Sequence, residues 1–409
     1  MNCRHCDTSL YYSFVNLGMS PLCQDHVKPE ELESMEPFYP LHAMVCEKCF
    51  LVQLNISVSP NKIFDEEYGY FSSFSDSWLR HAKNYTDLMV ERFGINSNSL
   101  VVELASNDGY LLQYFIEKQV PVLGIEPSGN VADAAIKKGI RTEKKFFGVH
   151  TAKEMAKQYG NADLLLGNNV LAHVPDINDF VSGMKIMLSA SGVITMEFPH
   201  LLRLIDENQF DTIYHEHFSY LSFSTVEKIF AFHGLRLFDV QELPTHGGSL
   251  RIYGCHQDNA TKPTSDNVAE LREREIKAGF QTLEFYSTFG DKVKETKRKL
   301  LEFLIQAKRE GKTIAGYGAP GKGNTLLNYC GIRTDFVDYT VDRSPHKQGN
   351  FLPGTRIPIY DPSKITETKP DYILILPWNL RKEIMEQMSH VRAWGGKFVV
   401  PIPEAKVYN

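Results

Sequence analysis

Two pairs of cysteines near the N-terminus have the spacing of a metal site. Cys3 and Cys6 are separated by two residues, and so are Cys46 and Cys49. Each Cys-x-x-Cys turn can place both thiolates on one side of a tetrahedral ion, and two pairs complete an all-sulfur site without an open position. We therefore expect a structural zinc ion here, with free thiols or a redox dithiol as the alternatives. Cys23, in the loop between the pairs, is expected to serve packing.

A small-residue turn at the end of an apolar strand predicts a cofactor site. Residues 101–111 read Val-Val-Glu-Leu-Ala-Ser-Asn-Asp-Gly-Tyr-Leu, and ligands of open α/β sheets bind at such turns. The next strand ends at Glu126, whose carboxylate can accept two hydrogen bonds from a ribose. This spacing suits both NAD and S-adenosylmethionine (SAM). One glycine instead of three, with nothing to neutralise a pyrophosphate, favours SAM.

A later strand end, at residues 167–174, resembles the fourth-strand motif of class I methyltransferases. A plain strand–turn–helix is the alternative for the first loop. The predicted cofactor-binding residues are Glu103, Ser106, Asn107, Asp108, Gly109, Tyr110, Leu111, Glu126, Pro127, Asn168 and Asn169.

A run of polar residues could perform acid–base chemistry. Tyr214, His215, Glu216 and His217 follow one another, and four such side chains are costly to bury unless they are paired. A histidine beside a glutamate supplies an orientable base. A surface turn and a metal site are the alternatives, although the His-x-His spacing suits a metal-bound helix poorly. The aromatic and hydroxyl-rich residues 67–75 lie upstream, with core packing as their alternative.

A glycine-rich loop in the last third predicts an anion site. Residues 315–325 read Ala-Gly-Tyr-Gly-Ala-Pro-Gly-Lys-Gly-Asn-Thr, after a strand and before a helix. Backbone N–H groups at a helix N-terminus, together with Lys322, suit the phosphates of a nucleotide-linked substrate. A tight structural turn is the alternative. Residues 342–349 could line the same crevice, and a Gly-Gly-Ser turn before Arg251 could contact a ligand or form only a hairpin.

Short apolar runs separated by helical stretches must position these groups, and they predict parallel sheets. We expect three parts: a zinc-binding domain at 1–75, a cofactor-binding domain at 76–268 and a C-terminal α/β domain at 269–409. The predicted strands are Ser99–Leu104, Val120–Ile125, Asp163–Leu166 and Gly192–Glu197, and then Thr313–Tyr317, Asp335–Val341, Tyr372–Leu376 and Lys397–Val400.

The composition is that of an ordinary globular protein of two or three domains, with 409 residues, 43% hydrophobic and 23% charged. A formal net charge of −6 gives no reason to expect nucleic acid or an anionic membrane as a partner. No apolar run reaches the roughly 20 residues of a membrane span, and no signal pattern opens the chain. We therefore expect a cytoplasmic protein, as a monomer or a weak homodimer.

The order of these motifs over nearly the whole chain resembles the sugar C-methyltransferases of nucleotide-deoxysugar biosynthesis, which act on carbon 3 of a nucleotide-linked 4-keto-6-deoxyhexose. The motifs that carry the resemblance are Leu17-Gly18-x-x-Pro21, Tyr68-x-Tyr70-Phe71-Ser72, Glu103-x-x-Ser106-Asn107-Asp108-Gly109, Tyr214-His215-Glu216-His217 and Gly316-Tyr317-Gly318-x-x-x-Lys322-Gly323-Asn324.

The resemblance implies an α/β protein in which a class I, Rossmann-like SAM domain lies between a four-cysteine zinc domain and a C-terminal Rossmann-like domain that holds the nucleotide. It also implies that a base removes the carbon-3 proton, and that the enolate attacks the methyl group of SAM. The base is then His217, with Glu216 orienting it or transferring protons, and Tyr68, Tyr214 and His173 line the sugar pocket. The predicted substrate-binding residues are Tyr70, Ser72, His246, Arg251, Lys322, Asn324 and Lys347.

Three functions stay open at this stage. The first is the sugar C-methyltransferase, with a dTDP- or GDP-linked sugar as substrate. The second is an NAD-dependent sugar-nucleotide oxidoreductase, because two Rossmann-like units invite it. The third is a non-catalytic, zinc-stabilised protein that binds a sugar nucleotide. Binding of SAM or of NADH separates the first two.

Overall fold

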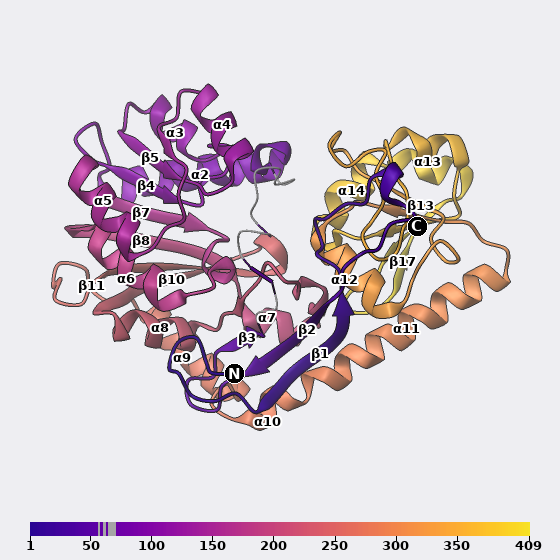
Figure 1. Cartoon of the computed structure of the whole chain (residues 1–409), viewed down its shortest axis with the longest axis horizontal. Coiled ribbons are helices and arrows are strands. Elements are labelled where there is room, and N and C mark those ends of the chain that lie inside the picture. The colour runs from indigo at the N-terminus through magenta and orange to yellow at the C-terminus, as the bar shows by residue number, and fades with distance from the viewer. Residues whose placement is uncertain (56–57, 60–62, 64–70) are drawn as a thin grey trace.

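The computed structural model describes residues 1–55, 58–59, 63 and 71–409 (Figure 1). Two α/β units, each built on its own sheet, lie on the two sides of the molecule. A smaller antiparallel sheet lies between them at the lower edge of the view, where the long helix α11 (Phe289–Arg309) extends toward the C-terminal unit. The predicted α/β class is confirmed, with two such units and a four-cysteine cluster near the N-terminus.

The larger sheet has seven strands. Parallel pairing joins the five strands at one side, because helical crossovers separate them in the chain, and a C-terminal hairpin adds two antiparallel strands. The four strands predicted in this part of the chain are present as β4, β5, β7 and β8. The spatial order is β10 (Leu235–Leu243), β11 (Ser249–His256), β8 (Leu188–Pro199), β7 (Ala162–Asn168), β4 (Val101–Leu104), β5 (Val122–Ile125) and β6 (Thr142–Glu143).

Helices cover both faces of this sheet. On one face, α2 (Asp76–Phe93), α3 (Leu112–Glu117) and α4 (Gly129–Lys137) pack on alternate strand residues such as Val101 and Leu164. The opposite face carries α5 (Val149–Tyr159), α6 (Ile177–Met187) and α8 (Phe223–Phe232), which pack on Val102 and Leu165. Strands buried on both sides explain the unbroken apolar runs of the sequence.

The C-terminal sheet has six strands, five parallel and one antiparallel. All four strands predicted here are present, but the one predicted at Asp335–Val341 begins only at Tyr339, since Phe336 and Val337 are held in a turn by the Arg333 carbonyl. The spatial order is β14 (Ile359–Tyr360), β13 (Tyr339–Val341), β12 (Ile314–Tyr317), β15 (Tyr372–Ile375), β16 (Lys397–Val400) and β17 (Lys406–Tyr408). Helices α12 (Gly321–Cys330), α13 (Ser363–Thr368) and α14 (Arg381–Gln387) connect them.

The N-terminal sheet takes its last strand from the middle of the chain. Its order is β1 (Tyr12–Ser20), β2 (Tyr39–Val45), β3 (Val52–Leu54) and β9 (Ser219–Tyr220). The β3–β9 pair joins the cysteine-containing segment to residues that directly follow the polar run at 214–217. The domain boundaries after residues 75 and 268 remain predictions, and this sheet includes residues from both sides of the first one.

The segment after the larger sheet holds the units together. It consists of α9 (Asp266–Ala278), α10 (Leu283–Ser287) and α11. In α11, the buried residues recur every three or four positions and form one stripe, so a charged helix still packs firmly. Its Phe289 stacks on Phe14 of β1 with ring centroids 4.5 Å apart. Among the described residues, no helix combines the length and the apolar character that crossing a membrane requires.

Candidate active site and zinc centre

The two Cys-x-x-Cys segments fold into turns of the same kind. After Cys6, Asp7 has a φ of 57° and its N–H donates to the Cys3 carbonyl, and after Cys49, Phe50 has a φ of 63° and its N–H donates to the Cys46 carbonyl. Each turn closes with an i+4 to i hydrogen bond, the α-turn geometry. The sequence pairs therefore become two matching turns that present their thiols to one point.

The four sulfur atoms fit a tetrahedral zinc ion. Cys3 and Cys49 are 3.5 Å apart, Cys6 and Cys46 are also 3.5 Å apart, and all four atoms lie within 4.8 Å of one another. Zinc–sulfur bonds of about 2.3 Å place tetrahedral sulfurs about 3.8 Å apart. Hydrogen bonds from Cys46 and Cys49 lower the pKa of Cys3, so the cluster favours a thiolate at this position. Four protein ligands leave no place for a substrate, which makes the site structural.

A cavity of about 550 Å³ lies where the two α/β units face each other. In each sheet the strand order reverses beside the first strand: between β4 and β7 in one, and between β12 and β15 in the other. Ligands of open α/β sheets bind at the carboxyl ends of the strands at such reversals. Residues at or just after the carboxyl ends of all four strands line this cavity, so the two reversal points share one space. They include Asn107, Asn168, Lys322 and Asn379.

The Glu126 carboxylate occupies the wall at the end of β5. It accepts the backbone N–H of Asn107 at 2.9 Å and that of Ser128 at 2.8 Å. Burial raises the pKa of Glu126, and these two donors oppose the rise. The remaining lone pairs suit the two hydroxyls of a ribose.

Unpartnered polar atoms at the end of β7 indicate where a ligand binds. Asn168 is 9% exposed, and neither its Oδ1 nor its Nδ2 has a hydrogen-bond partner among the described residues; the same holds for Asn169 Oδ1. Buried amides are normally hydrogen-bonded. Together with Glu126 they could hold the polar groups of SAM, and Phe146 and Phe147 supply an apolar wall.

The first loop is compact because three of its residues adopt left-handed backbone conformations. Ala105 has a φ of 55°, Asn107 of 49° and Gly109 of 74°. Glycine adopts this region without strain and asparagine tolerates it, whereas alanine does not, so Ala105 stores backbone strain in this loop. A Cβ at Gly109 would lie 2.1 Å from Ile140 Cδ1, which adds a steric need for glycine.

The predicted cofactor residues fall into two groups. The cavity is lined by Asn107, Tyr110, Glu126, Pro127, Asn168 and Asn169. The others, which do not line it, are Glu103, Ser106, Asp108, Gly109 and Leu111. Burial raises the pKa of Glu103 well above its usual range, while Lys138 holds Asp108 with an ion pair of 3.1 Å. The residues of this second group support the loop at 105–109 on the side away from the cavity.

The predicted catalytic residues come together around His217. Tyr214, Glu216 and His173 line the cavity, and His217 is in contact with two of them without being one of the lining residues. The His217 ring packs against His173 and Tyr214 with centroids 4.5 and 4.1 Å away. Tyr68 lies outside the described residues.

Hydrogen bonding fixes the protonation of His217. Its Nδ1 lies 2.8 Å from the Thr212 carbonyl oxygen, which can only accept, so the neutral ring carries its hydrogen on Nδ1. Nε2 has no partner among the described residues. Burial lowers the pKa of His217 well below its usual value, and the neighbouring His173 adds to this. His217 is therefore a neutral imidazole with a free lone pair on Nε2.

The predicted substrate residues are also divided. Ser72, His246, Lys322 and Lys347 line the cavity, while Arg251 and Asn324 do not. Arg251 is instead paired with Glu197 behind the wall. Tyr70 lies outside the described residues.

Lys322 comes from the C-terminal unit and is held in place from two sides. Its Nζ donates to Asn379 Oδ1 at 2.9 Å and lies 4.8 Å from the centroid of the Trp378 ring. Burial lowers the pKa of Lys322, and Asp211 partly offsets this. Asp211 in turn accepts the indole N–H of Trp378 at 2.6 Å. The ammonium group of Lys322 is therefore fixed in the same cavity that Glu126 and Asn168 line.

Several lining residues were missed by the sequence analysis. Trp78 and His81 lie three positions apart in α2, on one face of the helix that precedes the first strand, and that spacing was a usable signal. Asn379 follows the end of β15, where the strand-end rule predicts ligand contacts. Phe146 and Phe147 had no comparable signal, because they lie in a loop after a two-residue strand.

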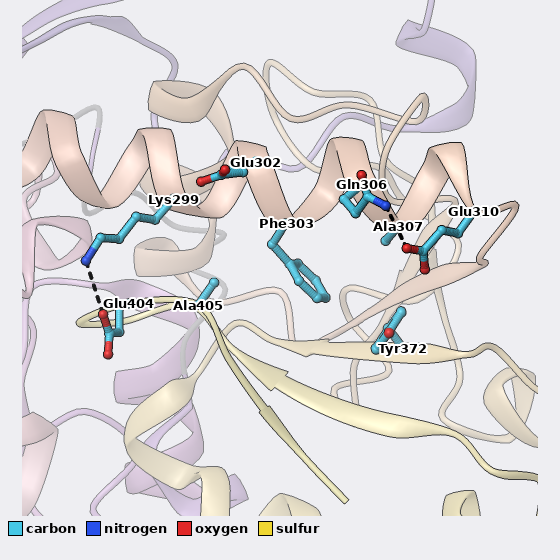
Figure 2. Close-up of a pocket in the computed structure, with 9 residues that line it drawn as sticks. All are labelled: Lys299, Glu302, Phe303, Gln306, Ala307, Glu310, Tyr372, Glu404 and Ala405. Atoms are coloured by element: carbon cyan, nitrogen blue, oxygen red, sulfur yellow. Dashed lines mark hydrogen bonds and ion pairs between the residues drawn. The ribbon is translucent and has the colours of Figure 1, made fainter.

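A second hollow, of about 490 Å³, lies between α11 and the C-terminal strands (Figure 2). Two pairs of its polar side chains bond to each other: Lys299 with Glu404 at 3.3 Å, and Gln306 with Glu310 at 2.7 Å. No described residue lines both this hollow and the large cavity. We assign it no part in the chemistry.

Comparisons with known proteins agree with this architecture. Family models described as a zinc binding domain, a methyltransferase domain and a C-methyltransferase C-terminal domain match residues 3–64, 78–240 and 244–403. The C-methyltransferase NovU of Streptomyces niveus is 36% identical over 409 residues, which are 100% of this chain and 96% of that protein.

Solved methyltransferases also match part of the chain. Magnesium protoporphyrin IX methyltransferase (ChlM) from Synechocystis PCC 6803, with bound SAM, is 13% identical with a TM-score of 0.36, over 50% of this chain and 100% of that one. A SAM-dependent methyltransferase from Clostridium acetobutylicum is 12% identical with a TM-score of 0.36, over 44% and 92%.

The site and the family matches define a SAM-dependent methyltransferase with a structural zinc centre at Cys3, Cys6, Cys46 and Cys49. The chain belongs to the C-methyltransferase family. This assignment leaves the oxidoreductase and the non-catalytic binding protein without support.

Proposed function

We propose that this enzyme methylates carbon 3 of a dTDP- or GDP-linked 4-keto-6-deoxyhexose. The observation that supports this most is the shared cavity. The SAM wall, with Glu126 and Asn168, faces a C-terminal wall that offers Lys322 and Lys347. Two cations and a helix N-terminus suit a diphosphate, so the methyl donor and a nucleotide-linked acceptor have separate walls of one space.

His217 is the base of the proposed reaction. A ketone at carbon 4 acidifies the carbon-3 proton, and the lone pair on Nε2 of the neutral His217 ring accepts that proton. The Thr212 carbonyl holds the ring in this tautomer. Glu216, the neighbouring residue, lines the cavity and orients the base or passes the proton on. When bound, SAM supplies an electrophilic methyl group for the carbon atom.

The enolate oxygen needs hydrogen-bond donors as its negative charge develops. Tyr214 and His173 line the cavity beside the base, and we propose that they serve this oxygen together with Tyr68. In a site that excludes water, each such donor contributes about 2.7–4 kcal/mol to the transition state.

His246 is proposed to contact the acceptor directly. It has a left-handed φ of 54°, and its Nε2 is buried without a partner among the described residues. A strained, unpartnered side chain at a cavity wall is typical of a ligand contact.

Incubation with methyl-labelled SAM and a panel of dTDP- and GDP-linked 4-keto-6-deoxy sugars tests the proposal. Mass spectrometry should find one added methyl group on the sugar ring, and tandem fragmentation should place it on carbon 3. Methylation at another position, or of no sugar nucleotide in the panel, would overturn the proposed substrate.

His217→Ala separates the base from cofactor binding. The variant should bind SAM normally by calorimetry but lose methyl transfer by about 10³-fold or more. His150→Ala, on the exposed side of α5, is the matched control and should keep full activity. Normal turnover of His217→Ala would refute the assignment of the base.

A further inference from the structure

A charged cluster in the cavity wall has no part in the chemistry proposed above. At its centre is Glu197 of β8, which is 1% exposed. Its carboxylate meets His81 Nε2 at 2.9 Å, Thr245 Oγ1 at 2.7 Å and Arg251 Nη2 at 3.1 Å. Burial alone would raise the pKa of Glu197, but His81 and Arg251 bring it down to about 2. Glu197 is therefore a permanent carboxylate with three donors.

Arg251 closes this cluster on the side away from the cavity. It is 3% exposed, its guanidinium lies 4.8 Å from the centroid of the Tyr85 ring, and Nη1 donates to Gln241 Oε1 at 3.3 Å. Because Nη2 donates to Glu197 and Nη1 to Gln241, Arg251 neutralises Glu197 and fixes its orientation. This explains why Arg251, which was predicted to bind the substrate, does not line the cavity.

His81 is the member of the cluster that presents a titratable ring to the cavity. Its side chain is 18% exposed, and the Trp78 ring stacks on it with centroids 4.9 Å apart. Because Nε2 faces the Glu197 carboxylate, the neutral ring carries its hydrogen there. No described residue hydrogen-bonds to Nδ1, so that atom keeps a free lone pair.

The other imidazoles of the cavity lead from His217 toward His81. His173 packs on His217, and His246 and His81 both contact the Trp78 ring, with His246 5.0 Å away. Burial lowers the pKa of His173 and His246 to about 4, so both rings are neutral imidazoles at neutral pH, not imidazolium ions. Within the part of the chain that the structure describes, Glu197 of β8, Arg251 of β11 and His246 are the charged or titratable groups that face His81.

We propose that His81 carries the proton released by C-methylation out of the cavity, and that Glu197 is the positioning residue for its ring. In the reaction a C–H bond breaks, a C–C bond forms, the sulfur–methyl bond of SAM breaks to leave S-adenosylhomocysteine, and one proton remains. Nδ1 of His81 accepts that proton, directly or through water, and releases it to solvent. This rests on the proton abstraction proposed above.

Chemical rescue of His81→Ala tests the proposal. With the acceptor from the panel that turns over fastest, methyl transfer should fall by about tenfold or more at low buffer concentration. Added imidazole should restore the rate in a saturable way, because it replaces the missing ring. SAM affinity, measured by calorimetry, should be unchanged, and His150→Ala should show neither the loss nor the rescue.

The outcomes separate this inference from the proposed function. A wild-type rate for His81→Ala, or a lowered rate that imidazole does not raise, overturns the proton-carrier role. Deuterium exchange at carbon 3 in the presence of S-adenosylhomocysteine examines the enolate independently. If the wild-type enzyme shows no such exchange, the proposed enolate is contradicted. The imidazole rescue of His81→Ala is measured on methyl transfer itself, so it tests the role of His81 whatever the exchange shows.

Glu197→Gln tests the positioning role. If Glu197 acts only through His81, the double variant His81→Ala/Glu197→Gln should have the same imidazole-rescued rate as His81→Ala alone. A much lower rescued rate, with thermal unfolding unchanged, would show that Glu197 has a separate function.

Discussion

The thiol of Cys23 donates a hydrogen bond to Glu216 Oε1 across 3.3 Å. Burial raises the pKa of Cys23 well above its usual value, so the thiol stays protonated and remains a donor. Its Sγ also lies 2.9 Å from the place that a Cβ on Gly321 would take. The loop between β1 and β2 therefore touches both the polar run and the C-terminal glycine loop.

Cys23→Ala should lower kcat by several-fold, because it removes a donor that helps to hold the Glu216 carboxylate in place. Cys23→Ser keeps a donor and should retain most of the activity. Steady-state kinetics with both variants measure the difference, and Cys255→Ala, a buried cysteine of β11, controls for loss of packing. Equal activity of the alanine and serine variants would leave Cys23 with packing alone.

Cys46→Ser should destabilise the protein by about 3 kcal/mol or more, because structural zinc contributes its binding energy to folding. Zinc content, measured by atomic absorption, should fall together with the midpoint of thermal unfolding. The control Cys330→Ser alters a buried cysteine of α12 and should keep the full zinc content. Retention of one zinc ion per chain by Cys46→Ser would contradict the assignment of the ligands.

Glu126→Gln should weaken SAM binding by about 10- to 100-fold, since a neutral amide accepts ribose hydrogen bonds less strongly than a carboxylate. Asn168→Ala should also weaken it. Isothermal titration calorimetry gives both affinities. Glu117→Gln, at an exposed position of α3, should bind as the wild type does, and unchanged binding by Glu126→Gln would place the ribose elsewhere.

Stability should fall as the pH is lowered from 6.5 toward 4. Burial depresses the pKa of His173 and His246 from 6.5 to about 4 in the folded state. Between these values the unfolded chain binds more protons, so acidification favours unfolding. Thermal unfolding across this range should show the trend, and it should be weaker in His173→Asn. A curve identical to the wild type would mean that His173 is not neutral in the folded protein.

Gly109→Ala should cost more stability than Gly139→Ala. Both positions have a left-handed φ, 74° and 82°, so alanine is strained by about 1 kcal/mol at each. Only at Gly109 does the new Cβ meet a neighbour, Ile140 Cδ1 at 2.1 Å, whereas nothing lies within 4 Å at Gly139. Chemical denaturation compares the two, and equal losses would show that the Ile140 side chain moves aside freely.

The sequence predicted the elements well because their signals are local. Apolar runs located the strands of both sheets, and Cys-x-x-Cys spacing located the zinc centre. Glu126 was found from its place at a strand end, which chain topology brings to the cavity.

What the sequence could not reveal depends on contacts between distant segments. Arg251 looked like a ligand contact, but its partner Glu197 lies 54 positions away and takes up its charge. The sequence placed His217 in the polar run, but only packing shows that its ring lies against His173 and Tyr214. Trp78 and His81 belong to no sequence motif. They could have been found only by noting that they share one face of α2.

The pairing of β3 with β9 restricts how this protein can be divided or recombined. Cutting the chain after residue 75 would leave β3 and β9 each with an unpaired edge, and exposed edges invite aggregation. An exchange of N-terminal segments between relatives would succeed only if the donor also matched Ser219–Tyr220 in register. The zinc-binding segment is thus not an independent domain that can be moved alone. A working exchange should transfer it together with residues 214–220.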